Sequence, residues 1–183
     1  MKKFELTSEF VTFLGKKLFR IKALISFGNV EEGELGGYVE KEENLSNDGN
    51  AWVYGDAWVY GDAMVYGNAM VYGNAMVYGN AMVSGNAMVY GNAMVYGDAW
   101  VYGNAMVYGD ADYATVQGFG SEYRTTTFFR TKAGDIGVRC GCFYGTLEEF
   151  RAKVKETHGE TKTAKEYLMV ADLMEFRFSK EEA

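Results

Sequence analysis

Three residues that could support acid–base or metal chemistry lie in the last third of the sequence. They are Cys140, Cys142 and His158, the only histidine among 183 residues. A histidine can act as a general base and thiolates can bind zinc, but a closed zinc site takes four ligands. Two cysteines on one expected strand and one distant histidine leave that set one ligand short. We therefore interpret the cysteines as free thiols and His158 as a structural residue at a helix end, and we expect no metal, cofactor or catalytic residue.

A basic cluster between residues 121 and 139 indicates binding chemistry instead. Guanidinium and hydroxyl groups suit a phosphate or a carboxylate, such as that of a nucleotide. A solvated basic strand face is the alternative interpretation, and the sequence leaves both open. The candidate ligand- or partner-binding residues are Ser121, Tyr123, Arg124, Arg130, Lys132 and Arg139.

The elements that must position this cluster form a small α+β domain over residues 113–183. Alternating apolar residues predict two strands, at 125–130 and 136–143, joined by a turn. The tetrapeptide Thr146-Leu147-Glu148-Glu149 is a capping box that opens a helix, and Gly159 ends it. Apolar residues at helical spacing predict a second helix. They are Tyr167, Val170, Ala171, Met174 and Phe178.

The middle of the chain is repetitive. Valine recurs at every sixth position from 53 to 107, which makes ten hexads of the form Val-Tyr-Gly-(Asn/Asp)-Ala-(Met/Trp), with Ser84 the only replacement of tyrosine. The alanine of one hexad and the valine of the next are two residues apart, so they face one side of a short strand. The residue between them and the residue after the valine face the other side. Each Gly-Asn or Gly-Asp pair then supplies a corner, because both residues tolerate a positive φ. The repeat therefore predicts short strands separated by corners.

These hexads resemble the left-handed parallel β-helix of hexapeptide-repeat proteins, in which an aliphatic and a small residue point inward in every repeat. The resemblance implies three hexads in each triangular turn, so ten hexads imply about three turns over residues 51–112. An open coil exposes strand edges, and we expect residues 1–50 to form a β-hairpin cap over one of them. The predicted fold is mainly β, with this cap before the helix and the α+β domain after it.

With three hexads in each turn, the outward side chains of every third hexad lie in one column. Such ladders stabilise a sheet by about 0.2–1 kcal/mol per neighbouring pair. An apolar surface of this extent is also suited to burial against a partner, a second copy or the protein's own flanks. The columns that we assign as an interaction surface contain Trp58, Met76 and Met94 beside Tyr60, Tyr78 and Tyr96.

Charge excludes some functions. The net charge of −7 divides into −2 for residues 1–50, −5 for 51–112 and 0 for 113–183, and the hexads contain neither lysine nor arginine. We therefore expect no direct nucleic-acid binding by the repeats. No run of about 18 apolar residues occurs, so we expect no membrane association. Two cysteines fit a reducing compartment, which predicts a cytoplasmic protein.

Many hexapeptide-repeat proteins are acyltransferases whose general base is a histidine on or near the coil. The ten hexads hold no histidine and lack the protruding loop that often shapes an acyl-donor site in that family. The resemblance therefore extends to the fold and stops before the activity. A degenerate acyltransferase remains one alternative, and a self-assembling structural coil remains another.

A nearer resemblance covers essentially the whole chain. The segments 36–46 and 126–145 are similar to those of hypothetical hexapeptide-repeat proteins carried by bacteriophages and prophages. Accessory phage proteins of this size often block a host defence system, either by occupying a defence protein or by sequestering its nucleotide signal. The resemblance thus implies a non-enzymatic binding protein in the cytoplasm of a bacterial host. Its partner would be a host protein or a nucleotide-like small molecule, and homo-oligomers would also fit.

Overall fold

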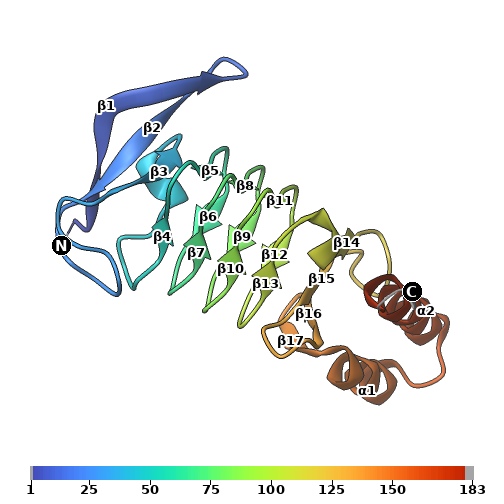
Figure 1. Cartoon of the computed structure of the whole chain (residues 1–183). Helices are drawn as coiled ribbons and strands as arrows, with labels where there is room; N and C mark the ends of the chain where they lie inside the picture. The colour runs from blue at the N-terminus through green and yellow to red at the C-terminus, as the bar shows by residue number, and fades with distance from the viewer. Residues whose placement is uncertain (1, 180–183) are drawn as a thin grey trace. The chain divides into compact units, whose positions relative to one another are not determined.

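The computed structural model describes residues 2–179. The chain forms two compact units, which divide between Asp110 and Ala111. The first contains the N-terminal strands and a parallel β-solenoid, and the second contains an antiparallel sheet with two helices (Figure 1). The predicted mainly β fold is confirmed in these parts.

Ten two-residue strands form the regular part of the solenoid, one from each hexad. They lie in three parallel stacks, β4-β7-β10-β13, β5-β8-β11 and β6-β9-β12. Each strand from β4 to β10 pairs with the strand of the third hexad after it, as Val71 does with Val89. The strands are β4 (Trp52–Val53), β5 (Trp58–Val59), β6 (Met64–Val65), β7 (Met70–Val71), β8 (Met76–Val77), β9 (Met82–Val83), β10 (Met88–Val89), β11 (Met94–Val95), β12 (Trp100–Val101) and β13 (Met106–Val107).

The solenoid has about four turns, because an irregular turn precedes the hexads. Strand β3 (Leu35–Val39) pairs in parallel with β5, with Tyr38 opposite Trp58, and Leu45 bridges Val65. In both cases the two paired residues are further apart in the sequence than the paired residues of the hexads are. Our expectation of about three turns counted only the hexads, and the segment that we assigned to the cap supplies β3 and the Leu45 bridge of the additional turn.

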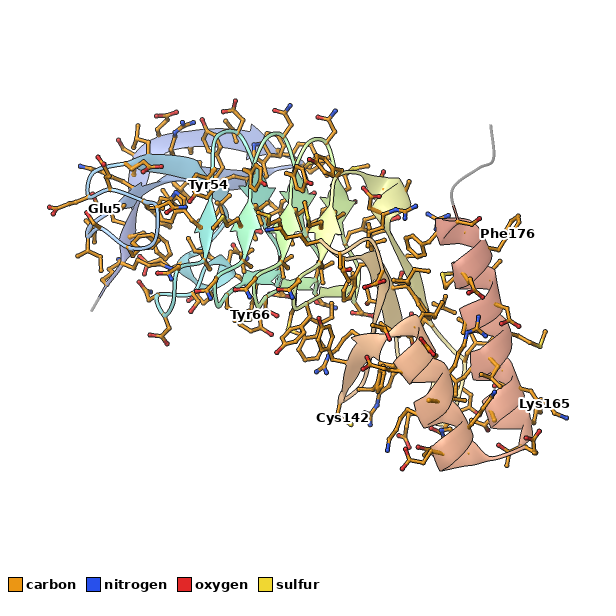
Figure 2. All side chains as sticks on the ribbon, turned by 60° about the horizontal axis from the view of Figure 1, so that its bottom comes forward. Glu5, Tyr54, Tyr66, Cys142, Lys165 and Phe176 are labelled. Atoms are coloured by element: carbon orange, nitrogen blue, oxygen red, sulfur yellow. The ribbon has the colours of Figure 1, made fainter. Side chains whose placement is uncertain are left out.

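The interior of the solenoid is filled by valine and alanine. The hexad valines are fully buried, and the alanines between them are at most 1% exposed. Tyrosines project outward instead, as Tyr54 and Tyr66 do in Figure 2. At the corners, glycine is required for two reasons. Gly85 has a φ of 72°, and a Cβ there would lie 2.8 Å from the backbone nitrogen of Gly103. The corner glycines thus permit both the bend and the stacking of turns.

An antiparallel hairpin extends one face of the solenoid. It is formed by β1 (Phe4–Phe13) and β2 (Lys16–Ala23), and β2 continues the sheet by pairing with β3. Leu14 and Gly15 turn the hairpin with φ values of 48° and 80°, as a two-residue hairpin turn requires. The hairpin that we expect within residues 1–50 is confirmed.

A buried amide replaces missing ladder donors at the first turn. Asn44 lies at the end of the short 3-10 helix η1 (Glu42–Asn44) and is fully buried. Its Nδ2 donates to the carbonyl of Gly61 at 3.0 Å and to that of Ala63 at 2.8 Å. The side chain therefore satisfies two carbonyls that another turn would otherwise have paired.

A buried amine has the same role on another side of this turn. Lys3 is 1% exposed, and its Nζ donates to the carbonyl of Ala51 at 2.8 Å. Burial lowers the pKa of Lys3 to about 8, against an opposing effect of Asp48. The end of the solenoid is thus closed by polar side chains as well as by the hairpin.

The second unit is a four-stranded antiparallel sheet with both helices packed against it. The strands are β14 (Tyr113–Val116), β15 (Thr126–Arg130), β16 (Ile136–Cys140) and β17 (Phe143–Thr146), in that order across the sheet. The helices are α1 (Leu147–His158) and α2 (Lys162–Phe178), and a short 3-10 helix, η2 (Asp110–Asp112), precedes β14. The predicted strand over 136–143 is wrong in one respect: Gly141, with a φ of 56°, and Cys142 form a turn that divides it into β16 and β17.

The first helix begins as its sequence predicts, and both helices pack with the predicted apolar side. Thr146 Oγ1 accepts from the backbone N–H of Glu149 at 3.2 Å, and the Glu149 carboxylate accepts from that of Thr146 at 2.7 Å, so the capping box is confirmed. Gly159 ends α1. Of the apolar residues expected on one face of α2, Val170 is only half-buried and the others are buried. The buried helix residues are Leu147, Phe150, Val154, Ala164, Tyr167, Ala171, Met174 and Phe178.

Candidate functional site

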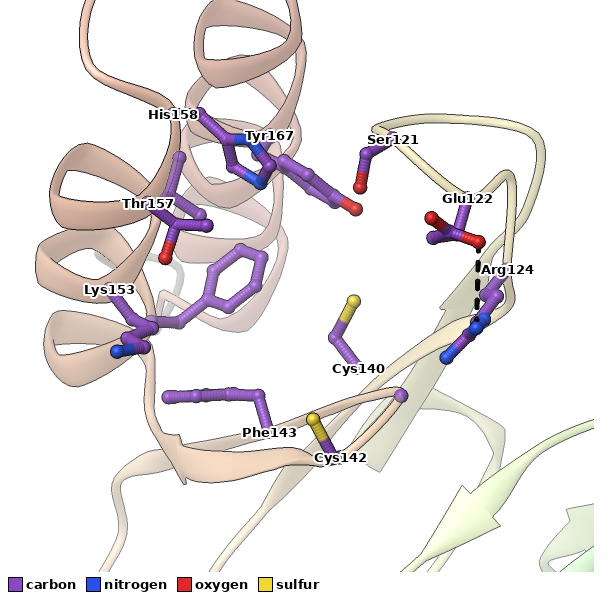
Figure 3. Close-up of a pocket in the computed structure, with 13 residues that line it drawn as sticks. Ser121, Glu122, Arg124, Cys140, Cys142, Phe143, Lys153, Thr157, His158 and Tyr167 are labelled. Atoms are coloured by element: carbon purple, nitrogen blue, oxygen red, sulfur yellow. Dashed lines mark ion pairs between the residues drawn. The ribbon is translucent and has the colours of Figure 1, made fainter.

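A pocket of about 290 Å³ opens in the second unit between the β16–β17 turn, both helices and the loop that precedes β15 (Figure 3). Ligand pockets in proteins commonly combine apolar walls with a few convergent polar groups, and this one has that composition. It is lined by Ser121, Glu122, Arg124, Cys140, Gly141, Cys142, Phe143, Phe150, Lys153, Val154, Thr157, His158 and Tyr167.

Aromatic rings form the apolar wall. The rings of Phe143 and Phe150 lie 5.5 Å apart, and Phe150 meets Tyr167 edge-to-face at 5.7 Å. His158 is the last residue of α1, and its imidazole stacks on Tyr167 with centroids 5.6 Å apart and planes 29° from parallel. Because these contacts hold the rings in place, the wall presents a preformed surface for a planar apolar group.

The loop before β15 is fitted to Tyr167. A Cβ on Gly120 would lie 1.9 Å from Cζ of Tyr167, so only glycine allows this approach. The backbone N–H of Gly120 donates to the carboxylate of Glu166 at 3.3 Å, and Ser121 hydrogen-bonds the Tyr167 hydroxyl. Burial raises the pKa of Tyr167 against the opposing effect of Ser121. The phenol therefore stays protonated at neutral pH and positions the loop at the mouth of the pocket.

The charges around the mouth are mainly basic. Arg124 lies 3.5 Å from Glu122, but both side chains are more than half exposed, so this ion pair is weak and easily exchanged. Lys153 forms a similarly exposed pair with Glu156, which does not line the pocket. Glu122 is the only acid among the lining residues. An anionic group at the mouth could therefore bind Arg124, whereas Lys153 lies on the opposite side of the pocket (Figure 3).

The structure brings only part of the predicted basic cluster to this pocket. Ser121 and Arg124 line it, whereas Tyr123, 70% exposed with a φ of 53°, lies between them on the loop without lining it. Lys132 is exposed in the turn after β15. The pocket thus contains two of the six residues proposed from sequence, and Tyr123 adjoins it.

The two remaining arginines lie elsewhere on the sheet. Arg130 lies 3.1 Å from Asp112 and donates to the Phe178 carbonyl at 3.0 Å, which ties the sheet to the end of α2. Arg139 donates to the Phe143 carbonyl at 3.3 Å. The strand register places Arg130 opposite Ile136, so Arg139, an odd number of positions further along β16, lies on the other face of the sheet from Arg130.

Several lining residues were not predicted, because they come from the helices. Lys153 and Thr157 lie one turn apart on α1, beside the buried stripe that contains Phe150 and Val154. Each follows a residue of that stripe by three positions, and this spacing is the sequence feature that could have indicated that they border the core.

The two thiols do not lie on one strand as expected, although both line the pocket. Cys140 is half-buried at the end of β16, and its sulfur accepts from Thr126 Oγ1 at 3.2 Å. Cys142 is exposed in the turn instead. The turn at Gly141 ends β16 before Cys142.

The predicted interaction surface on the solenoid is partly covered by the protein itself. Tyr60 and Tyr78 stack with centroids 5.0 Å apart, and Tyr78 and Tyr96 at 5.3 Å. Phe13 of the hairpin contacts both Trp58, at 5.0 Å, and Tyr60, at 5.8 Å. Exposure accordingly rises from 9% at Tyr60 to 50% at Tyr96.

The remaining residues of this surface, Met76 and Met94, are half-buried beside the tyrosine column.

Among residues 2–179, no group of three or more histidine, cysteine or acidic side chains is placed to hold a metal ion. Neither helix of that same part of the chain has the length and apolarity to cross a membrane.

The stacked parallel strands and the repeated sequence define a repeat β-solenoid protein. Its repeats match the family model described as YdcK Beta solenoid repeat, over residues 57–73, 63–78, 69–85, 75–90, 87–103 and 99–111. All of these matches lie within the hexads, so the similarity concerns the solenoid. No curated protein matches the chain.

Proposed function

We propose that this chain is a non-enzymatic binding protein whose second unit takes a small anionic ligand with a planar apolar part, as a nucleotide has. The observation that carries this proposal is the pocket of about 290 Å³, with an aromatic wall and a basic mouth. That volume is at the small end for ligand pockets and suits one nucleotide, or one half of a dinucleotide.

In this arrangement the planar group stacks beside Tyr167 and His158, and the phosphate binds Arg124. A guanidinium group binds a phosphate with two parallel hydrogen bonds, and its weak surface pair with Glu122 is easily exchanged. The Ser121 hydroxyl lies on the same loop and supplies a further polar group. Binding needs no chemical step, so no residue is assigned a catalytic role.

The resemblance of the flanking segments to phage and prophage hexapeptide-repeat proteins gives this binding a setting. We infer a phage-encoded inhibitor of a bacterial defence system, acting in the cytoplasm of the host. Such an inhibitor could occupy a host protein or sequester a nucleotide signal. The pocket supports the second mode, because a site with this composition recognises a small molecule.

One observation favours a second candidate, a degenerate hexapeptide acyltransferase. His158, the only histidine, lines the pocket. In an acyltransferase it would act as the general base. Acetyl-CoA binding that is lost in His158→Ala, together with acyl transfer, would favour this candidate over a pure binding protein.

Isothermal titration calorimetry with a panel of mononucleotides and cyclic dinucleotides tests the proposal. We expect saturable binding, weakened about tenfold or more in Arg124→Ala, because a hydrogen bond to a charged group contributes about 1.5–3 kcal/mol. Lys132→Ala is the matched control, since it removes an exposed cation outside the pocket. No binding of any nucleotide at millimolar concentration would overturn the nucleotide mode. Retention of one host protein from a lysate would then favour the other mode.

A further inference from the structure

Three large apolar side chains are exposed along one stripe of α2. Met169, Leu173 and Phe176 are 70%, 57% and 79% exposed. They succeed one another at the i, i+4, i+7 spacing that places side chains on one side of a helix. That side is opposite the one that α2 buries in the core of its own unit, and Phe176 projects away from the ribbon in Figure 2. A monomer in water gains nothing from such a stripe.

The charges beside the stripe follow the same heptad. If Met169, Leu173 and Phe176 occupy positions d, a and d, then Asp172 occupies position g and Arg177 the following position e. In a parallel pair of helices, position g lies beside the next position e of the partner helix. Asp172 would therefore meet Arg177 of the second copy, and two-fold symmetry would form this opposite-charge pair twice.

We propose that two copies of this chain associate through their α2 helices, which lie parallel about a two-fold axis along the stripe. Met169, Leu173 and Phe176 each pack against the same residue of the other copy. The face is self-complementary, as a two-fold interface must be. Arg151 of α1 hydrogen-bonds the Asp172 carboxylate, which stays 67% exposed, so the acid is held in position and still open to a second cation.

Sedimentation velocity of the full chain over a concentration series tests this interface. We expect a dimer for the natural sequence and a monomer for Leu173→Glu, with the dissociation constant raised about a hundredfold or more, because two carboxylates would meet in the apolar contact. Leu14→Glu is the matched control. It places the same charge on an exposed leucine of the hairpin turn and leaves the dimer intact.

A charge exchange tests the parallel orientation and leaves the apolar stripe unchanged. Asp172→Arg and Arg177→Asp should each weaken the dimer about tenfold, because each places like charges together twice. An equimolar mixture of the two variants should form a heterodimer, since every pair across the interface is then of opposite sign. Circular dichroism verifies that each variant is folded.

Three results would each overturn the proposal. The first is a natural sequence that stays monomeric at the highest soluble concentration. The second is a dimer unaffected by Leu173→Glu, which would place the interface elsewhere. The third is a mixture of the two charge variants that associates no more strongly than either variant alone.

Discussion

The solenoid and the C-terminal unit obtain their stability in opposite ways. In the solenoid, every turn repeats the same buried valine and alanine and the same glycine corner, so each position exists in several equivalent copies. In the second unit each core residue occurs once, and unlike side chains from β16, α1 and α2 meet around one core and line the pocket beside it. Repetition builds an extended scaffold, whereas a unique set of side chains is needed to shape a site.

The largest effect is expected from a charge inside the repeated region. Val77 is fully buried, and Val77→Asp would place a carboxylate among apolar side chains with no partner. We expect a loss of about 4 kcal/mol or more in the free energy of unfolding, measured by urea denaturation. Asn74→Asp at the preceding exposed corner is the control, with a change within about 0.5 kcal/mol, because the Asn92 amide, which accepts from Asn74, can turn and donate to the new carboxylate instead. A loss for Val77→Asp as small as that of the control would mean that the interior is not packed as described.

A pair of glycine substitutions separates the two requirements at a corner. Gly85 and Gly97 both have a positive φ, but a Cβ would touch the next turn only at Gly85. Both alanine variants incur the strain of the backbone conformation, about 1–2 kcal/mol, and Gly85→Ala should lose about 1–3 kcal/mol more because the stacked backbone must shift. Thermal unfolding monitored by circular dichroism measures the difference. Equal losses would show that stacking does not constrain the corner.

In the unique region, one glycine should affect binding rather than global stability. Gly120→Ala would push a methyl group into Tyr167 and move the loop that carries Ser121. We expect nucleotide affinity to fall about tenfold by calorimetry. Gly118→Ala also has a positive φ but meets no atom within 4 Å, so it is the matched control. Identical affinities in the two variants would argue that Tyr167 does not shape the site.

The smallest expected effect, per unit of pH, concerns Lys3. Its pKa is about 8 in the folded protein and about 10.5 in the unfolded chain, so between these values the unfolded chain binds more protons. Stability should therefore rise with pH from about 8 toward 10, by at most about 1.4 kcal/mol per unit. Urea denaturation across this range measures the slope, with Lys3→Met as the comparison. The same slope in Lys3→Met would assign it to another group.

The two regions also differ in how far their sequences predict them. The hexads specify their own register, because valine, alanine and glycine recur at every sixth position and can stack only on their equivalents. The first turn could not be predicted in this way. The chain from Tyr38 to Trp58, like that from Leu45 to Val65, is longer than three hexads, and residues 35–50 contain no hexad.

In the C-terminal unit, local features were predictable and tertiary ones were not. The capping box at Thr146 and the buried stripes of both helices follow from neighbours within a turn or two. The division of 136–143 at Gly141 was missed because apolar residues continue through the turn. The pocket was predicted only at Ser121 and Arg124, since its helix residues become neighbours of that loop only through the packing of α1 and α2.

The proposed ligand site can be tested most directly through His158, because the chain contains a single histidine. Its ring carbon protons give one identifiable pair of NMR signals. On titration with a nucleotide, we predict a saturable shift of these signals in the natural sequence. The affinity obtained from this shift should fall about tenfold in Arg124→Ala and stay unchanged in Lys132→Ala. Signals that stay fixed at millimolar nucleotide, or that shift equally in Arg124→Ala, would contradict a nucleotide site in this pocket.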